Sequence, residues 1–244
     1  MGKYEASTYG ERIADIYDEL YSGIENVKTM AEFLAGLARG GRALELGIGT
    51  GRVALPLAKQ GVEVHGIDAS PAMVAKLRAK PGGEAILVTI GNFAEIPVEG
   101  EFKIIYVVFN TFFALLTQGE QVGCFERVAH HLSADGAFVI EAFVPDLSRF
   151  DHGQRIATTK LQLNEVQLEA SVHDLPNQRV NTSHVVISES GLRLYPAQLR
   201  YAWPSELDLM GRVAGLRLRE RFGGWQSEPF TAASAKHVSV FERE

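Results

Sequence analysis

The chain has 244 residues, 46% of them hydrophobic, and carries a net charge of −6 with an isoelectric point near 5.7. That is enough apolar material for the core of one domain, or of one domain with an elaboration. The acidic balance, without a basic tail or cluster, argues against nucleic acid or an anionic membrane as the main partner. A single cysteine, Cys124, excludes an intrachain disulfide, and we see neither a signal peptide nor an apolar run long enough to span a membrane. We therefore expect a cytoplasmic protein.

Helical and strand periods alternate over the first 145 residues. Apolar residues recur at helical spacing over 13–20, which predicts one helix, and a second is expected from Glu25 to about Leu37. The elements expected after them are strand 42–46, helix 52–60, strand 62–68, helix 70–80, strand 84–90, strand 102–109, helix 119–132 and strand 136–144. Strands that alternate with helices across short turns are typical of a doubly wound parallel sheet in an α/β protein.

The period changes after Pro145. Four segments alternate apolar and polar residues with a period of two, namely 155–163, 166–174, 179–188 and 192–203. Such segments, separated by turn residues, predict antiparallel strands with one wet face. The earlier pattern then returns in a helix over 205–214 and strands over 216–222 and 237–243. We expect one domain built from residues 1–145 and 204–244, with residues 146–203 inserted as an antiparallel β cap on the substrate side.

An acid and three alternate glycines follow the first expected strand: Glu45, Gly47, Gly49 and Gly51. A phosphate-binding loop of the GxxxxGK[ST] type requires a lysine, and no lysine is suitably placed. A dinucleotide fold requires GxGxxG, whereas the spacing here is GxGxG and a carboxylate beside a diphosphate is unfavourable. The acid suits a ligand that carries positive charge and no phosphate. S-adenosylmethionine (SAM), with its sulfonium and ammonium groups, meets those conditions.

The glycine turn resembles motif I, (E/D)xGxGxG, of the class I SAM-dependent methyltransferases. Asp68, which ends the next strand and precedes Ala69, matches the acid that binds both ribose hydroxyls in that family. The segment GNFAEIP resembles the family's segment after the third strand. This likeness implies that Asn92, in place of the usual aspartate, contacts the adenine amino group and that Phe93 packs on the ring. The segment YVVFN resembles motif IV, whose backbone carbonyl near Val108 would receive the methionine ammonium.

Both ends of the chain extend the resemblance. YGERIADIYDELY is similar to the N-terminal helix that closes over SAM, with Tyr9 or Tyr17 as the lid aromatic, although Tyr17 also suits a core position. WPSELDLMGRVAGLRLRERFGGW is similar to the family's last helix and C-terminal hairpin. Within the family, the cap and the IYDELY start resemble small-molecule N-methyltransferases of natural-product biosynthesis, especially those that act on amino sugars. The resemblance implies a Rossmann-like seven-stranded sheet with one antiparallel strand, SAM as cofactor and S-adenosylhomocysteine as product. No metal is expected.

The sequence does not single out one catalytic group, and the candidates are Glu141, Asn110 and Tyr9. Glu141, at the end of a strand, could bind a substrate amine or be an exposed terminus. The candidate substrate contacts are Tyr9, Phe113, Glu141, Arg200, Trp203 and Trp225. Core packing is the competing interpretation for the tryptophans. His173 and His184 lie on expected cap strands, where either could face a substrate or simply a wet surface, and no CxxC or HxxxH spacing suggests a metal site.

The expected reaction is in-line displacement of a methyl group onto a small molecule. A nitrogen acceptor is favoured over an alcohol, because the ends of the fourth and fifth strands offer no histidine to act as a base. The alternatives are a small-molecule O-methyltransferase and a non-catalytic SAM-binding protein, while the glycine spacing disfavours a nicotinamide-dependent oxidoreductase. Neither nucleic acid nor a membrane is expected as a partner, and the β cap is a candidate surface for a homodimer.

Overall fold

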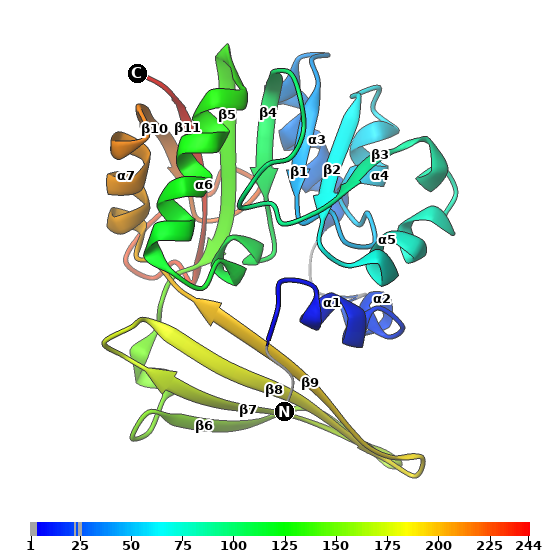
Figure 1. Cartoon of the computed structure of the whole chain (residues 1–244). Coiled ribbons are helices and arrows are strands. Elements are labelled where there is room, and N and C mark those ends of the chain that lie inside the picture. Colours follow the sequence, from blue (N-terminus) through cyan, green and yellow to red (C-terminus); the bar gives the residue numbers. More distant parts are fainter. Residues whose placement is uncertain (1–3, 22, 24–25) are drawn as a thin grey trace.

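The computed structural model describes residues 4–21, 23 and 26–244, and its centre is a seven-stranded sheet (Figure 1). The strands are β1 (Ala43–Leu46), β2 (Val64–Asp68), β3 (Leu87–Ile90), β4 (Phe102–Val107), β5 (Leu132–Phe143), β10 (Leu216–Phe222) and β11 (Lys236–Arg243). Their order is β10-β11-β5-β4-β1-β2-β3, and β11 runs antiparallel to its neighbours β5 and β10. The expected Rossmann-like sheet with one antiparallel strand is confirmed.

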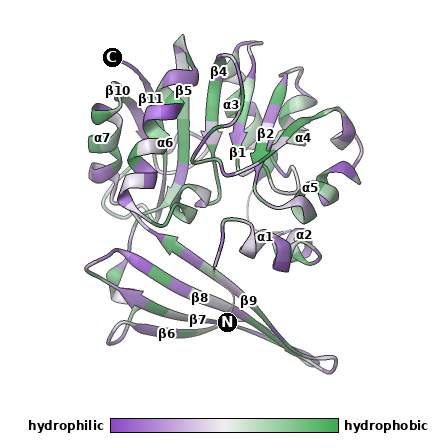
Figure 2. Cartoon of the chain, viewed as in Figure 1, coloured by the Kyte–Doolittle hydropathy of each residue, from purple (hydrophilic) through white to green (hydrophobic). Residues whose placement is uncertain are grey.

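Helices cover both faces of this sheet. They are α3 (Val27–Ala38), α4 (Ala54–Ala58), α5 (Pro71–Arg78), α6 (Gln118–His131) and α7 (Pro204–Val213), with short 3-10 turns η1 (Gly83–Ala85), η2 (Thr111–Ala114) and η3 (Leu147–Arg149). Residues of α6 and α7 pack in one core cluster, and residues of α3 and α4 pack in another on the opposite face. Hydrophobic residues therefore concentrate in the central strands, which are buried on both sides (Figure 2).

Local sequence signals explain where several helices begin. Ser70 is the N-cap of α5, its hydroxyl accepting from the Met73 N–H, and Pro71 takes the first helical position. Thr117 and Glu120 form a reciprocal capping box at the start of α6. Glu25, the expected start of the second helix, lies outside the described residues, and α3 begins at Val27.

The expected single helix over 13–20 is instead two short helices, α1 (Thr8–Ile13) and α2 (Tyr17–Leu20). They lie between the main sheet and the cap (Figure 1). Acidic side chains fasten them to the main domain. Glu11 accepts from the Ser70 hydroxyl at 2.7 Å, and Asp18 accepts from the Thr50 hydroxyl and forms an ion pair with Lys80.

The cap is a separate antiparallel sheet at the carboxyl edge of the central strands (Figure 1). Its strands are β6 (Gln154–Gln162), β7 (Glu165–Asp174), β8 (Arg179–Ser188) and β9 (Gly191–Arg200). The face turned toward the main sheet is polar, whereas the outer face exposes Ile156 by 77%, Val172 by 55% and Leu194 by 52%. The polar face expected of the cap is thus its inner face, which turns toward the main sheet.

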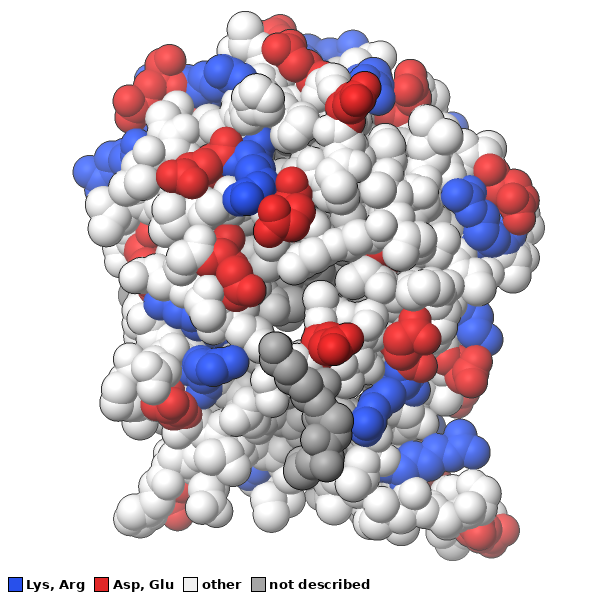
Figure 3. Space-filling model, viewed as in Figure 1, with Lys and Arg blue, Asp and Glu red and all other residues white. Residues whose placement is uncertain are grey.

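Charged side chains of both signs are interspersed over the face shown in Figure 3. No described helix has the length and apolarity that crossing a membrane requires.

A buried ion pair joins the cap to the main domain. The Arg200 guanidinium, at the end of β9, contacts Glu206 of α7 at 2.8 Å and donates to Gln121 of α6 at 2.5 Å. The Arg200 side chain therefore packs at the junction between the cap and the main domain, and it does not line the cavity described below.

We predict that Arg200→Ala lowers the free energy of unfolding by about 3 kcal/mol, because it leaves the Glu206 carboxylate poorly compensated. Urea denaturation followed by circular dichroism measures the change. Arg193→Ala, at an exposed position of the same strand, is the control and should have little effect. Equal denaturation midpoints for the two variants would contradict the structural role.

Candidate active site

The glycine turn after β1 is built from left-handed backbone. Gly47, Gly49 and Gly51 have φ angles of 77°, 54° and 76°. A Cβ atom on Gly47 would lie 2.5 Å from a methyl of Thr111, and one on Gly51 would lie 2.3 Å from a methyl of Leu77. Glycine is therefore required by both conformation and space. The turn presents Gly47 and Gly49 to a cavity, whereas Gly51 packs behind it.

Asp68, at the end of β2, ties this turn to the next strand. Its Oδ2 accepts from the Gly49 N–H at 2.7 Å, and its Oδ1 accepts from the Ser70 N–H at 2.8 Å. Burial raises the pKa of this carboxyl, and the two backbone N–H groups partly offset that effect. A carboxylate has about four lone-pair positions, so each oxygen can accept a further hydrogen bond from a ligand. Asp68 and Ala69 both line the cavity.

Glu45 lies behind the glycine turn, outside the lining of the cavity. It is 2% exposed, and the Tyr106 hydroxyl donates to its Oε2 at 3.0 Å. Burial raises the pKa of Glu45 to about 8, against the lowering effect of the Tyr106 hydrogen bond. At this pKa the carboxyl keeps its proton at neutral pH, so its influence on a ligand would act through support of the turn.

The turn after β4 forms the opposite wall. Phe109 and Asn110 are consecutive non-glycine residues with φ angles of 55° and 63°, a conformation that costs of order 1–3 kcal/mol for each residue. The Glu141 carboxylate accepts from the Phe109 N–H at 2.5 Å, and the Asn110 amide oxygen accepts from the Phe143 N–H at 2.7 Å. Glu141 is 3% exposed, so it is a buried support of this turn and not an exposed strand end.

Arg52 connects this wall to the lid formed by α1 and α2. Its guanidinium lies 4.2 Å from the centroid of the Phe109 ring and 5.8 Å from those of Tyr17 and Tyr21. It also donates to the Tyr21 carbonyl oxygen at 3.1 Å. The Tyr9 and Tyr21 hydroxyls form a hydrogen bond of 2.8 Å, and burial raises the pKa of Tyr17 to about 12. The lid phenols therefore stay protonated at neutral pH.

A cavity of about 650 Å³ lies between the main sheet, the lid and the cap. Of the candidates taken from the sequence, it is lined by Tyr9, Tyr17, Gly47, Gly49, Asp68, Ala69, Asn92, Phe93, Asn110 and Glu141. The candidates that lie outside it are Glu45, Gly51, Val108, Phe113, Arg200, Trp203 and Trp225. Trp225 packs edge-on against Phe33 in the core, and Phe113 is fully buried.

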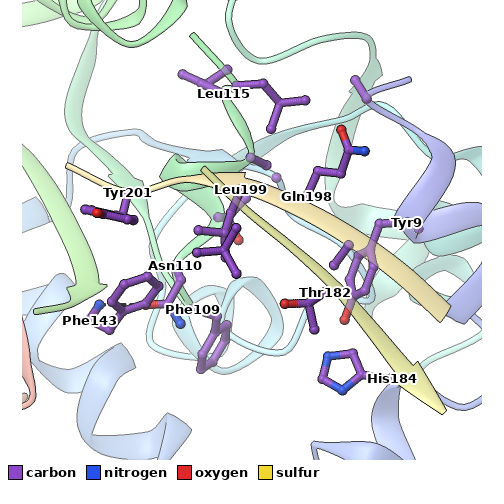
Figure 4. Close-up of a pocket in the computed structure, with 18 of the residues that line it drawn as sticks. Tyr9, Phe109, Asn110, Leu115, Phe143, Thr182, His184, Gln198, Leu199 and Tyr201 are labelled. Carbon is purple, nitrogen blue, oxygen red and sulfur yellow. Dashed lines mark hydrogen bonds between the residues drawn. The ribbon is translucent and has the colours of Figure 1, made fainter. Parts of the chain in front are cut away.

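The cap adds further polar side chains to the lining, of which Thr182, His184 and Gln198 are labelled in Figure 4. Arg155 and Glu169 form an ion pair at 2.7 Å. The Ser171 and Thr182 hydroxyls lie 2.8 Å apart, and His184 projects from β8 into the same space. Sequence analysis did not single out Arg155 and Glu169, because strand alternation alone does not show which cap face turns inward.

The histidines of the cap differ in their contacts. His173 Nε2 lies 2.9 Å from the Tyr201 hydroxyl, and burial lowers the pKa of His173. Burial also lowers the pKa of His184. Among the described residues, no group of three or more histidine, cysteine or acidic side chains is placed to hold a metal ion.

Strand order, the glycine turn after β1, the acid after β2 and a cavity at the carboxyl edge define the class I SAM-dependent methyltransferase arrangement. A family model described as "Methyltransferase domain" matches residues 43–136. The solved CcbJ methyltransferase from Streptomyces caelestis is 43% identical, with 98% of this chain and 99% of that chain covered and a TM-score of 0.93. The chain belongs to the SAM-dependent methyltransferases.

Two further relatives cover nearly the whole chain. The cypemycin N-terminal methyltransferase of Streptomyces sp is 26% identical, covering 98% of this chain and 99% of its own length. The sugar N-methyltransferase KedS8 from Streptoalloteichus shares the fold at 18% identity and a TM-score of 0.69, with 100% and 99% of the two chains covered.

We predict that Asp68→Ala weakens SAM binding by roughly ten- to a hundredfold, since a hydrogen bond to a charged group contributes about 1.5–3 kcal/mol. Isothermal titration calorimetry measures the affinity, with Asp135→Ala, an exposed acid far from the cavity lining, as control. Unchanged affinity in a folded Asp68→Ala protein would contradict the ribose assignment.

We also predict a pH effect from Glu45. The unfolded chain loses this proton near pH 4.5, whereas the folded protein keeps it up to about pH 8. Between those values the folded state binds more protons, so rising pH lowers the free energy of unfolding, by up to about 1.4 kcal/mol per pH unit. Glu45→Gln should lack this contribution. Urea denaturation of both proteins from pH 5 to 9, without ligand, checks it, and identical pH slopes would contradict the assignment.

Proposed function

We propose that this methyltransferase transfers the methyl group of SAM to an amine nitrogen of a small molecule. The observation that carries the proposal is the continuity of one cavity from the glycine turn to the polar inner face of the cap. A ligand bound at the turn and an acceptor bound under the cap would thus share one chamber. The volume of about 650 Å³ lies in the range of small-molecule sites.

The residues on the cofactor side fit SAM. The turn leaves no space for a Cβ at Gly47, so backbone can approach the ligand, and each oxygen of Asp68 can accept from a ribose hydroxyl. The aromatic rings of Tyr17 and Phe109 in the lining suit a cationic sulfonium through cation–π attraction. When bound, SAM supplies an electrophilic methyl group on a positively charged sulfur.

The protein's own contribution is alignment and exclusion of water. The nucleophile must approach the methyl carbon from the side opposite sulfur, and holding it there supplies roughly 7–11 kcal/mol. The lid closes one side of the chamber through Glu11 and Asp18, and the cap closes another. The proton of an alcohol must leave during attack, whereas an amine can lose its proton before attack and then react through its lone pair.

The relatives support a nitrogen acceptor. The cypemycin relative is named for methylation of an N-terminus, and KedS8 is named a sugar N-methyltransferase. The first name points to an N-terminus as methyl acceptor and the second to a nitrogen of a sugar. A hydroxyl acceptor remains the competing hypothesis.

The test is product mapping with trideuteromethyl-labelled SAM. The acceptor panel contains amino hexosides, the matched hydroxy hexosides and a short peptide with a free N-terminus. We expect the label on nitrogen only, located by tandem mass spectrometry. Label on oxygen alone would overturn the nitrogen assignment, and SAM binding without transfer to any amine in the panel would count against turnover of such acceptors.

A further inference from the structure

Glu169 and His184 face each other across the inner surface of the cap. They are directly paired in the antiparallel register of β7 and β8, and both line the cavity. Residues so paired have Cβ atoms about 4.5–5.5 Å apart and point to the same side of the sheet. In Figure 4 His184 lies beside Thr182, below the hydroxyl end of Tyr9.

Arg155 holds the Glu169 carboxylate in place through only one of its two oxygens. The ion pair runs from Arg155 Nη1 to Glu169 Oε1 at 2.7 Å. Over residues 4–21, 23 and 26–244, no hydrogen bond is found to Glu169 Oε2. A fixed carboxylate with one oxygen available is suited to binding an N–H group.

His184 is suited to accept a proton. Neither of its ring nitrogens forms a hydrogen bond with another residue in the described part of the chain. Burial lowers its pKa, only partly offset by Glu169, so the ring is neutral at pH 7 and carries a lone pair. Other titratable groups nearby are Tyr195, paired with His184 across β8 and β9, and the lid phenols of Tyr9 and Tyr21, the second of which interacts electrostatically with Glu169. Burial raises the pKa of both lid phenols, so they are uncharged at neutral pH.

Three other acid–base groups of the lining make hydrogen bonds within the protein. Glu141 is buried and accepts from the Phe109 backbone, and His173 Nε2 contacts the Tyr201 hydroxyl. Asp68 is bonded to the glycine turn on the cofactor side. Glu169 and His184 are thus the acid–base pair that the cap itself places in the chamber.

We propose that Glu169 and His184 form the site that binds and deprotonates the acceptor amine, an inference that rests on the proposed nitrogen transfer. The acceptor enters as an ammonium ion. Glu169 Oε2 accepts one of its N–H groups, and the imidazole of His184 takes one proton, which leaves the nitrogen lone pair free. The nitrogen lone pair then forms the new N–C bond as the S–CH₃ bond breaks. The electron pair of the broken bond stays on sulfur, which becomes a thioether sulfur. The imidazolium finally returns its proton to water.

Glu169 has a second part in this cycle. While His184 carries the proton, the carboxylate opposite it stabilises the imidazolium. Replacing Glu169 by glutamine should therefore lower the pKa of His184 as well as weaken binding of the cationic acceptor. A carboxylate that merely paired with Arg155 for stability would leave binding of the cationic acceptor unchanged, so the KM for the amine is the discriminating quantity.

The experiment compares His184→Ala and Glu169→Gln with Ser183→Ala, a neighbour on β8 whose side chain lies on the other face, outside the lining. The acceptor is the amino hexoside or free-N-terminus peptide that is turned over fastest in the product-mapping panel. We expect SAM affinity to stay within twofold in all three variants. We expect kcat/KM to fall about a hundred- to ten-thousandfold in His184→Ala, with partial rescue by added imidazole.

The pH dependence separates a proton acceptor from a structural residue. In the wild type, kcat/KM should fall at acidic pH with the protonation of His184, and this limb should disappear in His184→Ala. In Glu169→Gln, the KM for the amine should rise about tenfold. The His184 pKa, followed by NMR with ¹⁵N-labelled histidine, should fall.

The outcomes distinguish this inference from the function on which it rests. Label on oxygen alone would overturn the proposed transfer to nitrogen, which is the function on which this inference rests. Label on nitrogen, with His184→Ala and Glu169→Gln matching Ser183→Ala in kcat/KM and in pH profile, would overturn the inference and leave the nitrogen transfer standing.

Discussion

The strained turn after β4 is the constraint on which the chamber depends. Two consecutive residues, Phe109 and Asn110, hold left-handed backbone, and the buried Glu141 carboxylate of β5 fixes them through the Phe109 N–H. The turn aims the Phe109 ring at Arg52, which in turn holds the Tyr21 carbonyl of the lid. The turn after β4 and the lid are thus joined through one guanidinium. The strained backbone persists because the surrounding structure, including the Glu141 carboxylate, holds it in place.

The sequence predicted the sheet closely because its signal is local. Apart from Lys103, the run over 102–107 is apolar, since β4 is buried on both faces, and the glycine turn with GxGxG spacing directly follows β1. The lid was predicted less well: one helical period over 13–20 became two short helices whose position depends on contacts of Glu11 and Asp18 with distant residues. Long-range contacts of that kind leave no periodic signal.

The roles of single side chains were harder to predict than the elements. Arg200 and Trp225 were candidate substrate contacts, with core packing as the competing interpretation for the tryptophan. Arg200 forms a buried ion pair at the cap junction, and Trp225 packs in the core. Glu141 lies at the expected strand end but is buried there. In the cap, alternation showed two faces without showing which turns inward. The polar face turns inward and lines the cavity, which places Glu169 and His184 in that lining.

The polar inner face of the cap has an electrostatic role in the proposed reaction. SAM brings a sulfonium into the chamber, and an acceptor that arrives as an ammonium ion adds a second positive charge. At a separation of 4 Å and an effective dielectric constant of 20, the two repel by about 4 kcal/mol. In the proposed reaction two carboxylates of the chamber would offset these charges, Asp68 on the cofactor side and Glu169 on the acceptor side. His184 beside Glu169 would then remove the repulsion by taking the acceptor's proton, so that the acceptor loses its charge as it becomes a nucleophile.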